Sequence, residues 1–372
     1  MNLFKVFKSK RFIFQLVFLF CFTALLAVAF NNAYISLEKR GILPQFNFLF
    51  QSAGFDIGET FLDFNKNHSY LKAFFIGLLN TLWVSAWAIL TATLLGLFFG
   101  ILRLSKNPLL RFLSGIYIEF FRNIPLLLLL IFIKLGVFIQ MPQVKNALSY
   151  KGVVFLSNRG IHLLSLQWEH LAFFLFFFAL LTYLSLTLFK PLKRSLLFLT
   201  LSLLALLSLY IYFDFLSLSW PHFSGFNFKG GLELTPEFLS LFLGLSVYSS
   251  TFIAENVRAG IQSVFKGQKE AAFSLGLNDW QTLRWVVMPQ ALKVIIPPSI
   301  SQYLNLIKNS SLAAYIGYPE LFSIGGTIFN QTGRSIELTL MLMATYLSFS
   351  LITSVILNRF NSKVMLQKSE AS

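Results

Sequence analysis

The polar segment between two long apolar runs reads Glu270-Ala271-Ala272-Phe273-Ser274-Leu275-Gly276, followed after nine residues by Val286-Val287-Met288-Pro289. Its two alanines and Leu275 are spaced to form a small apolar helix face, and Gly276 permits a backbone turn that other residues resist. Asn278 and Gln281 have the spacing of a capping box, which starts a second helix. The segment is therefore predicted to be a helical hairpin whose exposed small residues suit the groove of another protein.

The chain on either side of this hairpin is too apolar for a soluble protein. Of its 372 residues, 56% are hydrophobic and 12% are charged, whereas a soluble domain carries about 25% charged residues. The 45 phenylalanines exceed what the core of one such chain can bury, so a lipid bilayer is the natural solvent. The net charge of +15 is spread between apolar runs rather than gathered in one patch, which argues against nucleic-acid binding.

Apolar stretches of about 20 residues predict eight transmembrane helices and an all-α polytopic membrane protein. The stretches are 12–30, 73–102, 113–140, 171–189, 195–213, 238–257, 291–307 and 338–357. Two of them are imperfect. The third contains Glu119, Arg122 and Lys134, and the seventh is interrupted by Pro297 and Pro298.

The basic residues predict that both termini are cytoplasmic, because loops on that side are enriched in Lys and Arg. Alternate segments between the predicted spans hold 18 such residues in the set that includes both termini and 9 in the other set. The first span also resembles a secretory signal, since Ala27-Val28-Ala29 would suit a cleavage site. Its apolar run is longer than a signal core, so we expect an uncleaved anchor, with cleavage as the alternative.

The hairpin resembles the EAA loop of permease subunits in ATP-binding-cassette importers, which has the same Glu-Ala-Ala, glycine and apolar-x-apolar-Pro elements at the same spacing. In that family the loop docks into a cleft of the ATPase subunit. The resemblance implies that Glu270, Ala271, Ala272, Gly276 and Pro289 couple ATP-driven closure to movement of the spans. An amphipathic surface hairpin without a partner is the alternative.

Further segments resemble the polar-amino-acid branch of these permeases. They are Asn80-Thr81-Leu82, 117–126, 248–267 and Lys308-Asn309-Ser310-Ser311-Leu312. This branch has a five-span core, here the second, third, sixth, seventh and eighth spans, and the three extra spans are similar to those of general amino-acid importers. The resemblance implies a type I importer permease that moves L-amino acids across a bacterial inner membrane by alternating access. An opine, a single amino acid such as glutamate, or another polar solute is the alternative substrate.

The resemblance also divides the chain and implies its partners. The expected parts are an anchor helix with a periplasmic loop (1–71), two core helices (72–140), an inserted loop with two helices (141–235), three core helices with the coupling loop at 260–289 (236–360), and a cytoplasmic tail (361–372). The implied partners are a homologous second permease, a pair of ATP-binding subunits and a periplasmic substrate-binding protein.

This chain is expected to be a non-catalytic subunit without a cofactor of its own. A phosphate-binding loop ends in Gly-Lys-Ser or Gly-Lys-Thr, and no Gly-Lys pair occurs in the sequence, so ATP and Mg²⁺ belong to the partner ATPase. The four histidines lack metal-ligand spacing and Cys21 is the single cysteine, so no metal site is expected. The rivals are an ion-driven secondary transporter and a membrane enzyme. The sequence shows neither two related halves with mid-span acids nor an interfacial catalytic cluster.

Two pairs of opposite charges lie three residues apart in predicted spans: Glu119 with Arg122, and Glu255 with Arg258. A charge at membrane depth costs about 2.5 to 3.5 kcal/mol and is therefore placed for a reason. We interpret both as structural ion pairs, with a gate as the alternative.

The seventh span is the favoured lining of the transport pathway. Pro297 and Pro298 free backbone carbonyls there, which a membrane tolerates only beside protein or a watery cavity. Lys308 has no acidic neighbour within one helical turn, so it is a candidate to meet a substrate carboxylate, with snorkelling to the outer interface as the alternative. The Asn and Ser side chains nearby have hydrogen bonding between helices as their alternative role. The polar candidates for the lining are Asn305, Lys308, Asn309 and Ser310.

Overall fold

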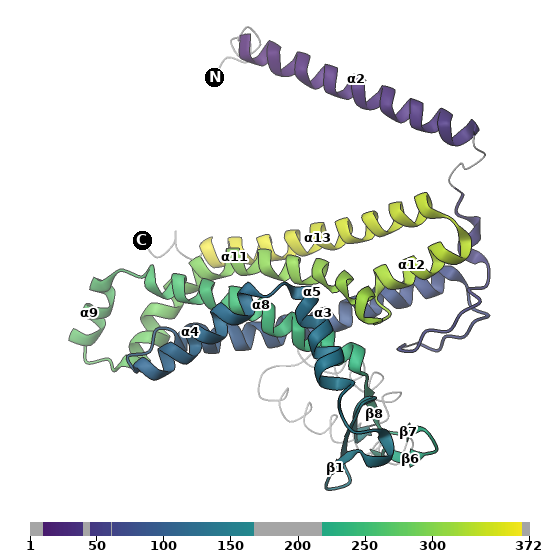
Figure 1. Ribbon diagram of the computed structural model, residues 1–372. Helices are drawn as coiled ribbons and strands as arrows, with labels where there is room; N and C mark the ends of the chain where they lie inside the picture. The colour runs from purple at the N-terminus through teal and green to yellow at the C-terminus, as the bar shows by residue number, and fades with distance from the viewer. Residues whose placement is uncertain (1–9, 40–44, 61, 167–217, 367–372) are drawn as a thin grey trace, which may run out of the picture.

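The computed structural model describes residues 10–39, 45–60, 62–166 and 218–366. The predicted spans 171–189 and 195–213 lie outside these residues. A separate first helix stands beside a bundle of long helices (Figure 1). The separate helix is α2 (Lys10–Lys39), and the bundle contains α3 (Tyr70–Leu102), α8 (Pro236–Gln262), α11 (Met288–Asn309), α12 (Leu321–Thr332) and α13 (Ser335–Leu366).

Helices α3 and α8 form the centre of the bundle and pack closely through two glycines. A Cβ built on Gly96 would lie 2.6 Å from the Cβ of Ile253, and one built on Gly100 would lie 2.7 Å from the carbonyl oxygen of Ala254. Both helices have defined starts, because the Ser69 and Thr235 hydroxyls accept backbone N–H groups of the first turn. Residues with no side chain at the crossing let the two backbones approach, as is usual between membrane helices.

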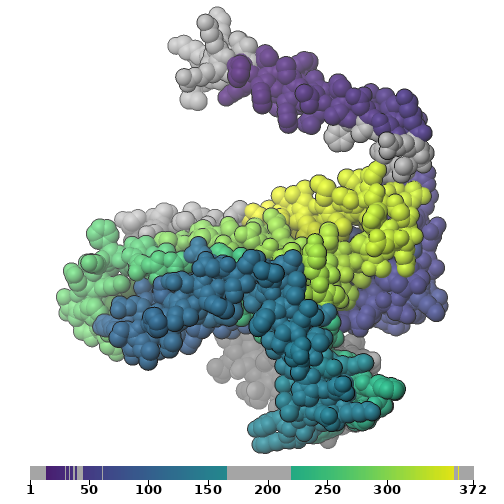
Figure 2. Space-filling view, in the orientation of Figure 1, coloured from purple at the N-terminus to yellow at the C-terminus, as the bar shows by residue number. Residues whose placement is uncertain are grey.

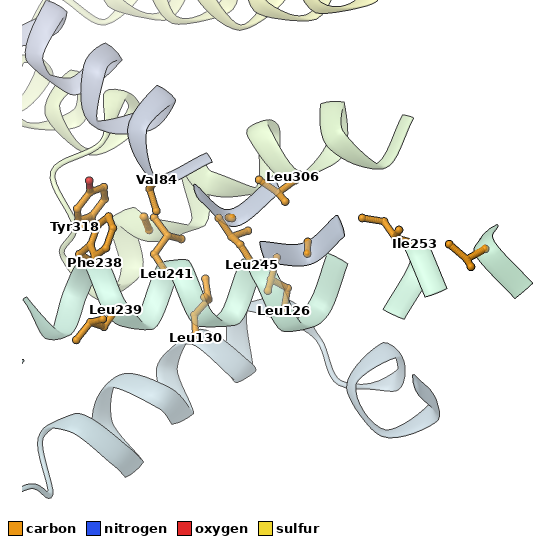
Figure 3. Close-up of a cluster of buried hydrophobic side chains, with 14 of the residues drawn as sticks. Val84, Leu126, Leu130, Phe238, Leu239, Leu241, Leu245, Ile253, Leu306 and Tyr318 are labelled. Carbon is orange, nitrogen blue, oxygen red and sulfur yellow. The ribbon is translucent and has the colours of Figure 1, made fainter. Parts of the chain in front are cut away.

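The main apolar core lies where α8 meets its neighbours (Figure 3). It includes Leu241 and Leu245 of α8, Val84 of α3, Leu130, and Leu306 of α11, all fully or almost fully buried. A second cluster lies where the loop before α3 packs against α12, and it includes η1 (Asn47–Phe50). The long helices are therefore joined by two separate apolar cores.

Four described helices are long and apolar enough to cross a membrane, at 14–36, 70–102, 236–262 and 335–355. They coincide with the first, second, sixth and eighth predicted spans. In the segment 14–36 of α2, every side chain whose burial the structure describes is exposed.

The third predicted span is not one straight helix. It is divided between α4 (Pro108–Asn123) and α5 (Leu126–Ile131), which continues into the π-helical η2 (Phe132–Phe138), and the two halves are bent by 103°. The bend falls at Ile124, whose backbone is extended (φ −86°, ψ 130°) because the ring of the following Pro125 excludes the helical conformation.

The seventh predicted span is helical throughout. Helix α11 continues through Pro297 and Pro298 without a break. Because proline has no N–H, the carbonyls of Lys293 and Val294 lose their helical donors. Three short elements precede α11 in the chain: α9 (Lys266–Ser274), α10 (Asp279–Gln281) and η4 (Thr282–Val287). The short helix η5 (Ser310–Ile316) follows it.

The inserted region contains β-structure that the sequence analysis did not predict. A four-stranded antiparallel sheet has the order β1-β2-β3-β8, and two strand pairs, β4 with β5 and β6 with β7, lie beside it. These strands project from the bundle at the end opposite α9 (Figures 1 and 2). The strands are β1 (Leu148–Tyr150), β2 (Val154–Ser157), β3 (Gly160–Leu163), β4 (Ser165–Leu166), β5 (Leu218–Ser219), β6 (His222–Ser224), β7 (Asn227–Lys229) and β8 (Leu232–Leu234). The short helix η3 (Val144–Asn146) precedes β1.

Candidate functional site

The predicted hairpin is present at one end of the bundle, called here the hairpin end (Figure 1). Helix α9 ends in a turn where Gly276 has φ +79°, a left-handed conformation that favours glycine. Asn278 and Gln281 then form the capping box, with reciprocal side-chain to backbone bonds of 2.9 and 3.0 Å. The turn at Gly276 and the start of the second helix at Asn278 are thus as the sequence predicted.

The hairpin exposes large apolar side chains rather than only small ones. Phe265 is 84% exposed, Leu275 81% and Trp280 64%. Ala272 is buried, whereas Glu270 and Ala271 are exposed, so the expected face of two alanines with Leu275 is split between the inner and outer sides. Exposed apolar groups of this size mark a surface that contacts another protein or a membrane.

The hairpin is attached to the bundle by an ion pair and by the chain itself, which runs on into α11. The Lys106 ammonium, in the turn between α3 and α4, pairs with the Asp279 carboxylate at 3.0 Å. Pro289 lies exposed in the first turn of α11, two residues after the buried Val287. The hairpin is therefore continuous with α11 and is joined to the turn between α3 and α4 by one exposed ion pair.

One of the two predicted ion pairs is wrong. Glu255 and Arg258 pair as predicted, but Glu119 pairs with Arg103 at 2.9 Å and not with Arg122. The guanidinium of Arg122 lies over the Phe252 ring, 5.2 Å from its centroid.

The partner of Glu119 is explained by a glycine one helical turn earlier. A Cβ built on Gly115 would lie 1.6 Å from Nη1 of Arg103, so the guanidinium crosses α4 where no side chain stands. Glu119 lies four residues further along the same face. The spacing of residues within α4 gives no signal for this pairing, because Arg103 lies at the end of α3.

Helix α11 carries a stripe of exposed residues along its length. These residues are Val294, Pro298, Ser301, Asn305 and Lys308, at alternating spacings of four and three. This spacing keeps them on one side of the helix.

The remaining pathway candidates lie off this stripe. Pro297 and Asn309 are half-buried, and Ser310 is fully buried, with its hydroxyl donating to the carbonyl of Ile307 at 2.7 Å. Ser310 is therefore on the packed side of the chain and not with Asn305 and Lys308.

Two lysines near the predicted outer half of the bundle have different surroundings. Lys134 pairs with the Glu237 carboxylate at 2.9 Å and donates to the carbonyl of Ile316 at 2.5 Å. Lys308 is exposed, and within the described ranges no carboxylate lies within 4.0 Å of its ammonium. Of these two cations, only Lys308 has an ammonium that is open to a ligand.

Sequence reasoning gave Asn80 and Thr81 no physical role, and the structure supplies one. The Asn80 amide donates to the carbonyls of Glu59 (2.9 Å) and Pro319 (2.8 Å). The Thr81 hydroxyl accepts the N–H of Leu321 at 3.0 Å. These two adjacent residues of α3 therefore fix the turn between η5 and α12 and the loop before α3.

Glu59 of this loop is a buried acid. Its carboxylate accepts a hydrogen bond from the Thr235 hydroxyl. Burial raises the pKa of Glu59 to about 7, the hydrogen bond acts in the opposite direction, and the carboxylates of Glu237 and Glu233 add to the rise. The folded chain keeps a proton that the unfolded chain releases near pH 4.5. The contribution of Glu59 to the free energy of unfolding therefore falls as the pH rises from 4.5 towards 7 and is constant above that.

The substitution Glu59→Gln should remove this loss, because glutamine stays neutral and its oxygen can still accept from Thr235. We expect the thermal unfolding midpoint of the variant in detergent to exceed that of the parent above pH 7 and to match it near pH 4.5. A midpoint difference that is the same at both pH values would contradict this assignment.

Comparison with known proteins places these features in context. The family model described as "Binding-protein-dependent transport system inner membrane component" matches residues 92–366. The chain is 43% identical over 371 residues to "Putative amino-acid ABC transporter permease protein YhdX" of Escherichia coli strain K12, covering 96% of this chain and 94% of the relative. It is 38% identical to "General L-amino acid transport system permease protein AapQ" of Rhizobium johnstonii, covering 90% of this chain and 87% of the relative.

A solved structure shares the fold. It is described as "Crystal structure of an amino acid ABC transporter with histidines", with a TM-score of 0.50, 22% sequence identity, and coverage of 79% of this chain and 95% of the other. The fold of this chain is thus one already seen in a solved structure.

Proposed function

Because this chain belongs to the family of binding-protein-dependent transport system inner membrane components, we propose that it moves L-amino acids across the bacterial inner membrane by alternating access. It is the permease subunit of an ATP-binding-cassette importer. A separate ATPase pair, which binds ATP and Mg²⁺, drives the movement.

The observation that carries this proposal is the exposed stripe of α11. A membrane helix that presents Ser301, Asn305 and Lys308 outward cannot face lipid without the cost of placing polar groups in hydrocarbon. The carbonyls freed by Pro297 and Pro298 add to that cost. A water-filled pathway shared with a homologous second permease removes it, and the stripe then lines that pathway.

The hairpin supports docking of the ATPase subunit. Its exposed Phe265, Leu275 and Trp280 form a protruding apolar surface beside Glu270 and Ala271. A groove on an ATPase subunit would bury this surface, and closure of the ATPase pair would then displace α9. The hairpin end is accordingly the cytoplasmic end, both termini are cytoplasmic, and the β-strands at the opposite end face the periplasmic binding protein.

Amino acids are the proposed substrate class because the relatives that match most of the chain are described as amino-acid permeases. Every free amino acid carries a carboxylate, for which the exposed ammonium of Lys308 is a suitable partner. An opine, a single amino acid such as glutamate, or another polar solute is the alternative.

Lys308→Ala tests the assigned contact. If Lys308 meets the substrate carboxylate, the variant should lose about tenfold in uptake efficiency, because a hydrogen bond to a charged group contributes about 1.5 to 3 kcal/mol. Lys293→Ala, which removes a cation from the same helix away from the stripe, is the matched control. Uptake kinetics identical to those of the parent would assign Lys308 to snorkelling at the outer interface instead.

The function itself is tested by uptake of radiolabelled amino acids into proteoliposomes. The vesicles contain this chain with its candidate second permease and ATPase, with ATP and the binding protein supplied on their respective sides. ATP-dependent accumulation of several amino acids is the expected result. ATP hydrolysis without amino-acid uptake would overturn the substrate class, and accumulation by this chain alone in an ion gradient would overturn the ATP-driven mechanism.

A further inference from the structure

A cavity of about 630 Å³ lies at the hairpin end, between the end of α3, the start of α4 and the end of α8. It is separate from the α11 stripe, and none of its lining residues belongs to the hairpin. Three arginines from the three helices converge on it. The lining residues are Arg103, Pro108, Arg111, Phe112, Arg258 and Gln262.

The charges around this cavity leave it positive. Arg103 is paired with Glu119, and Arg258 is paired with Glu255 while it also donates to the Gln262 side chain at 2.8 Å. Within the described ranges, no carboxylate lies within 4.0 Å of the exposed Arg111 guanidinium. Three guanidiniums therefore face two carboxylates, and the site has room for one further negative charge.

The start of α4 strengthens this preference for an anion. Pro108 is the first residue of the 16-residue helix, so the positive end of the helix dipole points at the cavity. Arginine guanidiniums match the geometry of phosphate oxygens, with which they form paired hydrogen bonds. Phosphate is thus the anion that these groups suit best.

One wall of the cavity is apolar and continues out of it. Phe112 lines the cavity, and the same face of α4 carries Leu109, Leu113 and Ile116, which are 49 to 63% exposed together with Phe112. A ligand with an anionic head and a hydrocarbon tail would cover both parts. A free amino acid would also need an acceptor for its ammonium group, and the two nearby carboxylates are already paired.

The location at the ends of the membrane helices is that of a lipid headgroup layer, where basic pockets between helices bind anionic headgroups. We propose that this cavity binds the phosphate of an anionic glycerophospholipid, whose acyl chain lies along the exposed face of α4. The site depends on the proposed function only in that the hairpin end faces the cytoplasmic leaflet.

Native mass spectrometry of the full chain purified in detergent tests this site without ATP, substrate or partners. Phosphatidylglycerol and phosphatidylcholine are added at equal concentrations, and the fraction of lipid-bound protein is measured. We expect phosphatidylglycerol to be retained in preference to phosphatidylcholine. Arg111→Gln should reduce its binding by about tenfold, the loss expected for a charge-assisted hydrogen bond. Lys293→Gln removes a cation outside the cavity and should leave binding unchanged.

A second variant acts on the cavity without removing a charge. Gly115→Ala places a methyl group where Nη1 of Arg103 lies and should displace that guanidinium, again weakening phosphatidylglycerol binding. Equal binding of the two lipids, or unchanged binding in both cavity variants, would overturn the proposal. Displacement of the lipid by equimolar inorganic phosphate or glycerol 3-phosphate would assign the site to a free phosphate and overturn the lipid assignment. Because this readout needs neither uptake nor ATP hydrolysis, its failure is distinct from failure of the proposed transport function.

Discussion

Gly276→Asp abolishes ATP-driven uptake while the chain still inserts and folds, if the hairpin is the docking element. Gly276 has φ +79°, and a Cβ built on it meets no atom within 4 Å, so the side chain would project freely from the turn. The cost to the fold is about 1 kcal/mol of backbone strain. The cost to docking is larger, because an unpaired carboxylate would have to be buried in the ATPase groove.

The measurement is copurification of the ATPase subunit together with uptake in proteoliposomes. Gly333→Asp is a matched control, since Gly333 has φ +68° and equally empty surroundings but lies at the turn between α12 and α13. Both variants should lose the same small amount of thermal stability, and Gly276→Asp alone should lose the ATPase. Normal copurification and normal uptake of Gly276→Asp would refute the docking role.

Asn80→Ala should have the largest effect on stability. Asn80 is fully buried, and its side-chain amide donates hydrogen bonds to the carbonyls of Glu59 and Pro319. The substitution removes this donor from both carbonyls. Each unsatisfied buried group costs about 1 to 3 kcal/mol, so the two carbonyls together should lower the free energy of unfolding by about 2 to 6 kcal/mol.

Unfolding of the detergent-solubilised protein by heat or by SDS measures this loss. Asn330→Ala is the control, because Asn330 is exposed on α12 and should change stability by less than about 0.5 kcal/mol. A parent-like unfolding transition of Asn80→Ala would show that the two carbonyls find other donors. The contact that fixes the turn would then be Thr81 alone.

The features that the sequence predicted correctly are those with local signals. The long apolar runs at α3, α8 and α13 and the capping box at Asn278 depend on residues that are close in the chain. The bend before Pro125 was equally local, but it was hidden by an apolar run that reads as one span. A proline after Asn123 and Ile124 is the signal that should have divided it.

The features that the sequence did not predict depend on contacts between distant residues. Glu119 meets Arg103 because Gly115 leaves space between α3 and α4, and no spacing rule within one helix contains that information. The sheet was missed because its strands are two to four residues long, too short for an alternating pattern to be recognised. Ser310 was assigned to the pathway from its polarity, whereas the packing of η5 decides that it is buried.

The close glycine contacts between α3 and α8 have a mechanical consequence. Gly96 and Gly100 let Ile253 and Val257 of α8 pack directly against the backbone of α3, so we expect the two helices to move as one unit. The hairpin helix begins four residues after α8 ends, at Lys266. We therefore expect a displacement of the hairpin to move α3 and α8 together, and the bend of 103° between α4 and α5 to be the place where the permease flexes.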